Sequence, residues 1–158
     1  MQQAISLLEL NQIIRDSLEN NLSPSYWVIA EIGELKLAAA GHAYLELVEK
    51  NGNQVKAKIR ANIWQYSFRT IAGRFLAMTG KELRAGMKVL ALATVTFHEL
   101  YGISLTIKDI DPNYTLGERA RIRQEIIDRL RHEGMMDLNK RFELPSVPQR
   151  VAVISSQT

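Results

Sequence analysis

The feature that most constrains the fold is an alternating stretch at residues 42–64, HAYLELVEKNGNQVKAKIRANIW. It consists of two segments joined by Asn51-Gly52-Asn53. In the second segment apolar and polar side chains alternate, which is the period-two pattern of a half-buried strand. The expected inner face holds Val55, Ala57, Ile59, Ala61 and Ile63, and the expected outer face holds Lys56, Lys58, Arg60 and Asn62. The stretch therefore predicts an antiparallel hairpin with one face buried and the other in water.

The outer face of this hairpin is a row of cations with aromatic residues near its ends. Side chains on one face of a strand follow each other at roughly 6.5–7 Å, and Tyr44 and Trp64 lie on the cationic side. Positive charge combined with stacking surface is what single-stranded nucleic acid requires of a protein. The alternative is that Lys56, Lys58 and Arg60 form an ordinary solvated face. The hairpin taken alone favours this alternative.

Composition excludes several classes of function. The 158 residues suffice for one domain with a real core, and 46% apolar with 23% charged residues is ordinary for a globular protein. The net charge of +3 is too small to identify a nucleic-acid-binding protein unless the charges cluster. The absence of cysteine excludes disulfides, thiolate metal sites and a cysteine nucleophile. No secretion signal or apolar run of membrane length occurs, so we expect a soluble, cytoplasmic protein with no membrane contact.

Before the hairpin, the sequence predicts a helix and a long strand. Ser6 and Glu9 form the S-x-x-E pattern of a capping box at the start of the helix. Apolar residues follow at helical spacing and are expected to lie in the core; they are Leu7, Leu10, Ile13, Ile14 and Leu18. A strand is predicted at residues 26–37, where Gly33 indicates a bulge or a sharp bend. Such a bend suits a strand that serves two sides of a small barrel.

After the hairpin, the sequence predicts a helix of two to four turns and then two more strands. The helix ends near Thr79-Gly80, and its apolar residues at helical spacing are Phe68, Ile71, Phe75 and Met78. The strands are predicted at residues 87–97 and 102–110, and residues 98–101 connect them. Five strands in so short a stretch most economically close into a barrel, because closure removes exposed edges.

The order of these elements predicts a mainly β fold, a five-stranded OB-fold barrel with an N-terminal helix and a helical insertion between strands 3 and 4. A C-terminal helix and a linker are expected to follow. In an OB-fold the second and third strands, with the flanking loops, form the binding surface, and here these strands are the hairpin. The fold therefore favours binding by the cationic row, although an analogy of fold does not establish a site.

Beyond the barrel, Thr115 and Glu118 form a second capping box, which predicts a helix at residues 116–134 that ends at Gly134. Its expected inward residues are Leu116, Ile122, Ile126, Ile127 and Leu130. Its arginines alternate with acidic residues, which is typical of a solvated, salt-bridged surface.

The end of the chain predicts a linker at residues 135–149 and a buried strand at 150–156, RVAVISS. Because one buried strand needs partner strands, we expect the chain to be the front part of a longer protein. The predicted domains are the N-terminal helix with the OB-fold at 1–113, a helix and linker at 114–149, and the first strand of a truncated domain at 150–158.

Patterns of catalytic and metal-binding residues are absent from the sequence. The three histidines lack the spacing of a histidine metal site, and residues 73–82 depart from the spacing of a phosphate-binding loop. Asp109 and Asp111 are explained by turn chemistry at a strand exit, and no Ser/His/Asp arrangement can be argued from spacing. We therefore expect no catalytic residue, metal site or cofactor in this chain.

Six short segments occur in a fixed order along the chain. They lie at 5–11 (ISLLELN), 31–32 (EI), 41–47 (GHAYLEL), 133–137 (EGMMD), 144–145 (LP) and 150–156 (RVAVISS). Together they resemble the large subunit of bacterial exodeoxyribonuclease VII. Each segment alone is weak, but their joint order is specific and covers nearly the whole chain.

The resemblance implies an OB-fold domain that holds single-stranded DNA, a catalytic domain that begins at residues 150–158, and long helices that bind several small subunits. It also implies an enzyme that hydrolyses phosphodiester bonds of single-stranded DNA from either end, releasing oligonucleotides without a strict metal requirement. In this interpretation the catalytic residues lie beyond Thr158, so the present chain would bind DNA without cleaving it.

The residues predicted to contact nucleic acid combine charges and rings. The cations Lys56, Lys58 and Arg60 are expected to face phosphates, and the expected stacking or loop contacts are His42, Tyr44, Trp64, His98 and Tyr101. The chain departs from the family pattern in the loop at residues 98–102, HELYG, where the family's usual arginine is missing. The competing hypothesis is an OB domain that docks other domains or subunits without contacting DNA.

Overall fold

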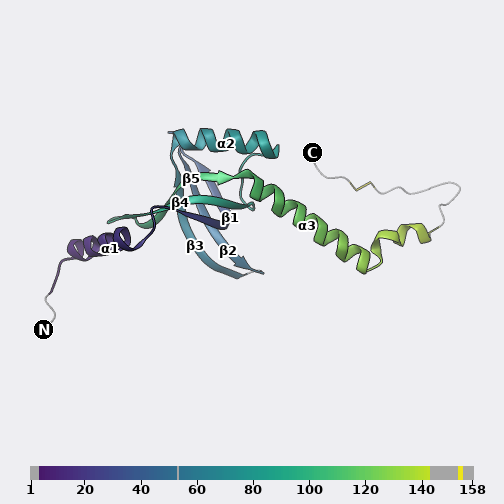
Figure 1. The fold of residues 1–158 in the computed structure, drawn as a ribbon, viewed down its shortest axis with the longest axis horizontal. Helices are drawn as coiled ribbons and strands as arrows, with labels where there is room; N and C mark the ends of the chain where they lie inside the picture. Colours follow the sequence, from purple (N-terminus) through teal and green to yellow (C-terminus); the bar gives the residue numbers. More distant parts are fainter. Residues whose placement is uncertain (1–3, 53, 143–152, 155–158) are drawn as a thin grey trace. The chain divides into compact units, whose positions relative to one another are not determined.

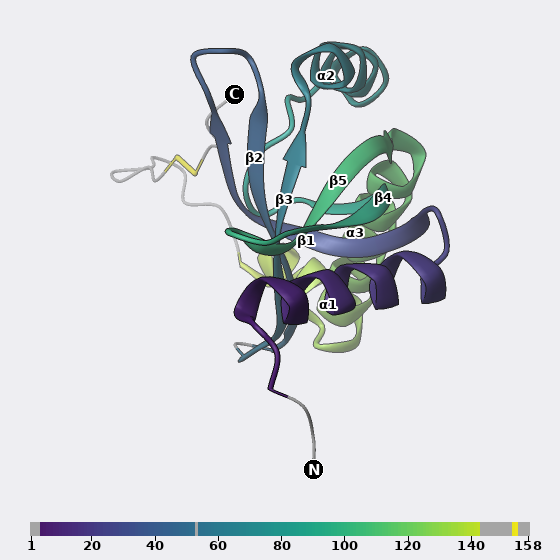
Figure 2. The same cartoon turned by 90° about the vertical axis from the view of Figure 1, so that its left-hand side faces the viewer.

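The strands close into a barrel. The computed structural model describes residues 4–52, 54–142 and 153–154. Around the barrel the strand order is β1-β2-β3-β5-β4, with β1 at Tyr26–Leu37, β2 at Ala43–Asn51, β3 at Gln54–Ile63, β4 at Lys88–His98 and β5 at Gly102–Asp111. The helix α2 (Gln65–Thr79) joins β3 to β4 and lies across one end of the barrel in both ribbon views (Figures 1 and 2). The predicted OB-fold architecture is confirmed.

The strand β1 serves two sides of the barrel, as its glycine predicts. Its first half pairs with β4 and its second half with β2, and the register with β2 shifts between Ile32 and Glu34. A Cβ atom at Gly33 would lie 3.1 Å from Cγ1 of Val48, so a larger residue there would have to shift this side chain on the neighbouring strand. The bulge predicted at Gly33 is therefore confirmed.

The core fills the barrel and the space beneath α2. Its most deeply buried large side chains are Phe75, Ile32, Ile63, Ile107, Ile110 and Val89. The alternation predicted for β3 holds only in the second half of the strand, where Ala61 and Ile63 are buried. Val55 and Ala57 are exposed, because the turn end of the β2–β3 hairpin extends beyond the barrel (Figure 1). Within the predicted turn, Gly52 has a φ of 59°, and Asn53 lies outside the described residues.

The helix α1 (Leu7–Asn21) begins with the predicted capping box. Ser6 Oγ accepts from the backbone N–H of Glu9 at 3.1 Å, and Glu9 Oε2 accepts from the Ser6 N–H at 2.6 Å. The bond from the Ser6 backbone holds the pKa of Glu9 below its usual value.

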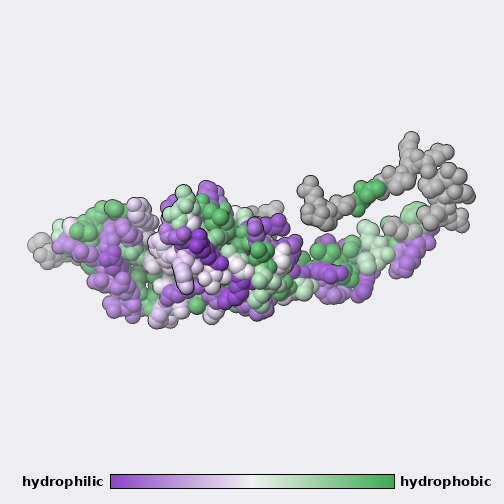
Figure 3. All heavy atoms as spheres, turned by 90° about the horizontal axis from the view of Figure 1, so that it is seen from above, coloured by the Kyte–Doolittle hydropathy of each residue, from purple (hydrophilic) through white to green (hydrophobic). Residues whose placement is uncertain are grey.

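The prediction that α1 contributes its apolar stripe to the core is wrong. None of the residues of α1 is buried, and Leu7 is 75% exposed. Apolar atoms over α1 are visible at the surface in Figure 3. The helix lies outside the closed barrel, and only the face with Asn11, Ile14, Arg15 and Leu18 is half-buried.

The helix α3 (Pro112–His132) starts earlier than the sequence predicts. Asp111 Oδ1 accepts from the Asn113 N–H at 2.9 Å, and Pro112 fits the first helical position, where no N–H is needed. Thr115 is buried, and its hydroxyl donates to the Lys88 carbonyl at 3.2 Å. The capping box predicted at Thr115 is therefore wrong, because the strand β5 passes directly into the helix.

Contacts divide the chain into two units, Met1–Arg119 and Ala120–Thr158. In the second unit, α3 is followed by the short 3-10 helix η1 (Met135–Arg141), where the sequence predicts a linker. The predicted inward orientation is wrong for Leu116, Ile122 and Ile126, which are exposed, whereas Ile127 and Leu130 are half-buried. The predicted salt-bridged surface is confirmed by ion pairs that include Arg121 with Glu125 and Arg131 with Asp128.

The domain boundaries at 113/114 and 149/150 stay predictions. The rest of the predicted linker, 143–149, and the predicted strand at 150–156, apart from Val153 and Ile154, lie outside the described residues. Val153 and Ile154 are exposed. In the part of the chain that the structure describes, no helix is long and apolar enough to cross a membrane.

Candidate nucleic-acid interface

A hollow of about 660 Å³ lies on the outside of the barrel, bordered by β2, β3 and the two ends of β4 and β5 that the loop connects. Five of the eight predicted site residues line it: Tyr44, Arg60, Trp64, His98 and Tyr101. They come from a hairpin and a loop that are well separated in the sequence. The closed barrel thus brings the predicted hairpin residues and the predicted loop residues to one place.

The rings in this hollow are open to solvent. Tyr44 and Trp64 are each 51% exposed, and Tyr101 is 77% exposed. The rings of His98 and Tyr101 lie against each other with centroids 4.8 Å apart and planes tilted by 40°. His98 Nδ1 accepts from the Leu100 N–H at 3.1 Å, which ties the ring to its own loop. The hollow therefore presents aromatic surface that no part of the described chain covers fully.

The cationic row on β3 is uneven in charge. Lys58 Nζ lies 2.8 Å from Glu46 Oε2 on the neighbouring strand, and Lys56 Nζ donates to Gln54 Oε1 at 3.0 Å. Neither lysine lines the hollow. Arg60 does line it and makes no ion pair with any residue in the described ranges. The positive charge that is available to a ligand in the hollow is thus centred on Arg60.

His42 lies outside the hollow and holds its edge in place. Trp64 occupies the N-cap position of α2, where its side chain makes no capping hydrogen bond. His42 Nδ1 instead accepts from the Gln65 N–H at 3.0 Å, and its ring meets that of Trp64 edge to face with centroids 5.0 Å apart. A histidine before β2 therefore caps a helix that begins more than twenty residues later and orients the Trp64 ring.

The hollow also contains residues that the sequence pattern does not single out. Among them are Asn62 on β3, Phe97 on β4, and Ile103 and Ser104 on β5. Asn62 Oδ1 is buried without a hydrogen-bond partner among the described residues, which is costly for a polar atom. The residues of β5 reach the hollow because β5 pairs with β3, with Asn62 opposite Thr106. No local pattern in the sequence predicts this pairing.

The carboxylates near the end of β5 have structural partners. Asp109 forms an ion pair with Arg74 of α2, and Asp111 caps α3, in agreement with the predicted turn chemistry at Asp111. Among residues 4–52, 54–142 and 153–154, no cluster of three or more His, Cys, Asp or Glu residues could hold a metal ion.

Residues 5–111 match a protein family described as an OB-fold nucleic acid binding domain. The chain belongs to this family. The match covers the whole barrel and the helices α1 and α2. The hollow of this OB-fold domain lies on the face of β2 and β3, as the fold predicts.

The resemblance found in the sequence is confirmed by curated relatives, which are named exodeoxyribonuclease 7 large subunit. The protein of Deinococcus radiodurans is 34% identical over 98% of this chain and 38% of its own length. That of Stenotrophomonas maltophilia is 30% identical over 95% and 31%, and that of Alkaliphilus oremlandii is 27% identical over 98% and 35%. The chain thus spans about a third of the length of these relatives.

One solved structure, the mitochondrial single-stranded DNA binding protein Rim1 of S. cerevisiae, covers 55% of this chain and 90% of its own. It is 14% identical, with a TM-score of 0.36.

The His42 cap yields a prediction about stability. His42→Ala should lower the free energy of unfolding by about 1 kcal/mol, because the Gln65 N–H loses its acceptor at the start of α2. It should also shift the fluorescence emission of Trp64, whose ring loses its edge-to-face neighbour. The measurement is urea unfolding followed by circular dichroism and tryptophan emission.

Tyr66→Ala is the matched control, because Tyr66 lies on the same helix and is 87% exposed. This substitution should change stability by no more than about 0.5 kcal/mol. Equal stability of the two variants would show that His42 does not cap α2.

Proposed function

We propose that this chain is the single-stranded-DNA-binding part of an exodeoxyribonuclease VII large subunit. The observation that carries the proposal is the hollow, in which exposed rings lie together with Arg60, which has no ion-pair partner among the described residues, on the binding face of an OB-fold nucleic acid binding domain. Rings that stack bases, combined with a cation for phosphate, are the two components of single-strand binding without strict sequence preference.

In this proposal the bases of the strand stack on Tyr44, Trp64 and Tyr101. The ring of His98 packs against that of Tyr101 and stabilises its position. Arg60 neutralises a phosphate at the hollow. The remaining predicted residues have secondary parts: His42 orients Trp64, while Lys56 and Lys58 extend the path along the hairpin.

For the whole protein we propose hydrolysis of phosphodiester bonds in single-stranded DNA from either end, giving oligonucleotides. Small subunits of exonuclease VII are the proposed protein partners, bound by parts of such proteins outside this chain. Support comes from the names of the relatives and from the third of their length that this chain matches. We assign DNA binding to the third of the protein that this chain matches and hydrolysis to the rest. We also infer a cytoplasmic location, because bacterial DNA, the proposed substrate, lies in the cytoplasm.

A second candidate is an OB domain that docks other protein domains and does not contact DNA. It is favoured by exposed apolar side chains elsewhere on the barrel, of which Trp27 is 53% and Ile29 is 51% exposed on β1. It is weakened by the hollow, because protein docking on β1 leaves the gathering of rings around Arg60 unexplained.

The proposal is tested by titrating the chain with a fluorescently labelled single-stranded oligonucleotide longer than the about 4–16 nucleotides that an OB-fold covers. We expect saturable binding that weakens as the salt concentration rises, and weaker binding of the same sequence as a duplex. The oligonucleotide from the same tubes should run at its full length on a gel. Failure to bind at low salt would favour the docking domain. Shortened products would contradict the assignment of hydrolysis to other parts of the protein.

Tyr44 should contribute stacking energy that does not depend on salt. Tyr44→Ala is expected to weaken binding by about 1–3 kcal/mol, or about 5- to 150-fold in Kd, at every salt concentration. Tyr66→Ala again serves as the control, since this exposed ring does not line the hollow. An unchanged Kd for Tyr44→Ala would remove this residue from the binding site.

The uneven cationic row predicts different effects for its members. Each phosphate neutralised on a single strand adds about 0.7 to the slope of log K against log salt, so Arg60→Ala should reduce the slope by about that amount. Lys58→Ala should reduce it less, because Glu46 already neutralises this lysine, whereas Glu46→Gln should tighten binding. Salt slopes of Arg60→Ala and Lys58→Ala that equal the slope of the parent chain would show that the row is solvated surface.

A further inference from the structure

The base of the loop that carries Tyr101 is held by the pairing of His98 with Gly102, but the side chains at its tip have little support from the barrel. Between β4 and β5 the chain makes a tight turn, in which the Tyr101 N–H donates to the His98 carbonyl at 3.2 Å. Leu100 is 81% exposed and Tyr101 is 77% exposed, so neither side chain anchors the loop by burial. A contact from another element is therefore needed to fix the tip of the loop, so that His98 and Tyr101 keep their positions at the hollow.

The N-terminal helix supplies this anchor through Glu99. Arg15 of α1 forms an ion pair with the Glu99 carboxylate, and Asn11 Nδ2 donates to the Glu99 carbonyl at 3.5 Å. The Glu99 side chain is only 22% exposed, so water screens its attraction to Arg15 less than it would screen an ion pair at a fully exposed position. Asn11 and Arg15 are one helical turn apart and therefore lie on the same face of α1.

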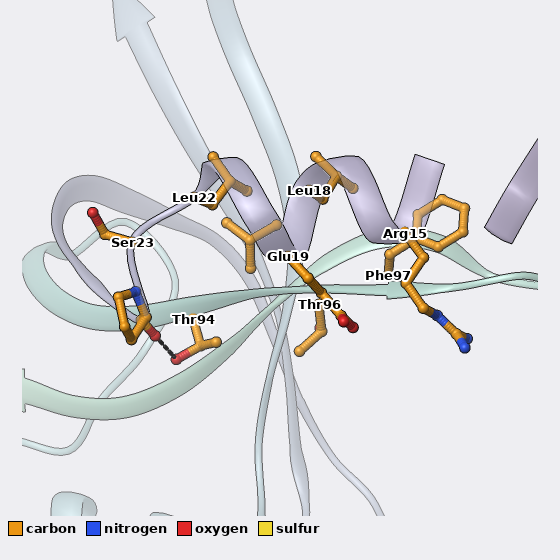
Figure 4. A pocket seen from close by; sticks show the side chains of 10 residues that line it. Arg15, Leu18, Glu19, Leu22, Ser23, Thr94, Thr96 and Phe97 are labelled. Atoms are coloured by element: carbon orange, nitrogen blue, oxygen red, sulfur yellow. Dashed lines mark hydrogen bonds between the residues drawn. The ribbon is translucent and has the colours of Figure 1, made fainter. Parts of the chain in front are cut away.

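The helix α1 lies along the outside of β4. A groove of about 360 Å³ separates them, lined by Leu18 and Leu22 on one side and by residues 94–97 on the other (Figure 4). Thr94 Oγ1 donates to the Pro24 carbonyl at 2.9 Å just after the helix. Phe97 lines both this groove and the aromatic hollow, so α1 and the hollow share one wall.

We propose that α1 is a positioning element for the hollow: Asn11 and Arg15 hold Glu99 and so keep His98 and Tyr101 in place before a ligand arrives. The inference rests on the proposed function, since the hollow is taken to bind single-stranded DNA. A helix that contributes no residue to the core acquires in this way a specific task. Ordering a loop in advance lowers the entropy that binding must otherwise remove.

Glu99→Gln separates this role from simple electrostatics. Removal of a negative charge beside a DNA-binding hollow should tighten binding if charge alone matters. Removal of the anchor should instead weaken binding, by about 2- to 10-fold in Kd. The double variant Arg15→Glu with Glu99→Arg keeps the net charge and rebuilds the pair in reverse, so it should regain most of the affinity. Glu49→Gln, at an exposed position on β2, is the control for loss of one negative charge.

Binding to the labelled single strand is measured together with amide hydrogen exchange of residues 99–101 in the free protein. We expect faster exchange in Glu99→Gln and recovery in the double variant, with unchanged exchange in Glu49→Gln. A parent chain that binds DNA while Glu99→Gln binds equally or more tightly would overturn the positioning role alone. A parent chain that does not bind DNA would overturn the proposed function and this role with it, and unchanged exchange in Glu99→Gln would refute the anchor in either case.

Discussion

The parallel pairing of β3 with β5 is the contact on which the rest of the structure depends. The pairing of β1 with β4 joins the first three strands to the last two on one side, and the pairing of β3 with β5 closes the barrel on the other side through only two residue pairs, Ala61 with Leu105 and Asn62 with Thr106. Without it the sheet would have two open edges, and the hairpin and the β4–β5 loop would not meet. Because the pairing is so short, the neighbouring parts of β3 and β5 are free to line the hollow, which includes Ile103 and Ser104 just before the paired residues.

The Gly41-His42 pair connects the fold to the site. Gly41 has a φ of 83°, a conformation that favours glycine, and a Cβ atom there would lie 2.8 Å from Cγ of Gln65, so a larger residue would also have to move this side chain. This close approach lets His42 reach the first N–H of α2 and set the Trp64 ring. The segment at residues 41–47 carries part of the family resemblance. Its first two residues are explained by their contacts with the start of α2.

Local patterns predict the strands and their order, whereas contacts between distant residues remain beyond them. The hairpin, the bulge at Gly33 and the helix at Gln65–Thr79 follow from alternation, glycine geometry and helical spacing. The stripe on α1 shows that the helix is amphipathic but not that it packs outside a closed barrel. The S-x-x-E type of pattern at Thr115 cannot reveal that a helix has already begun at Pro112. The pair between Arg15 and Glu99 depends on tertiary placement alone.

The same limit applies to charge. On the printed sequence the row of Lys56, Lys58 and Arg60 reads as three equal cations, but the register of β2 and β3 places Glu46 opposite Arg60 and within reach of Lys58. In the proposed complex the hollow thus offers several open rings and the cation Arg60, which has no ion-pair partner in the part of the chain that the structure describes. One phosphate contact changes the affinity by only about fivefold for a tenfold change in salt, whereas each stacked base contributes about 1–3 kcal/mol. In the proposed complex stacking therefore sets most of the affinity, and we expect binding to persist at salt concentrations that would remove a purely electrostatic binder.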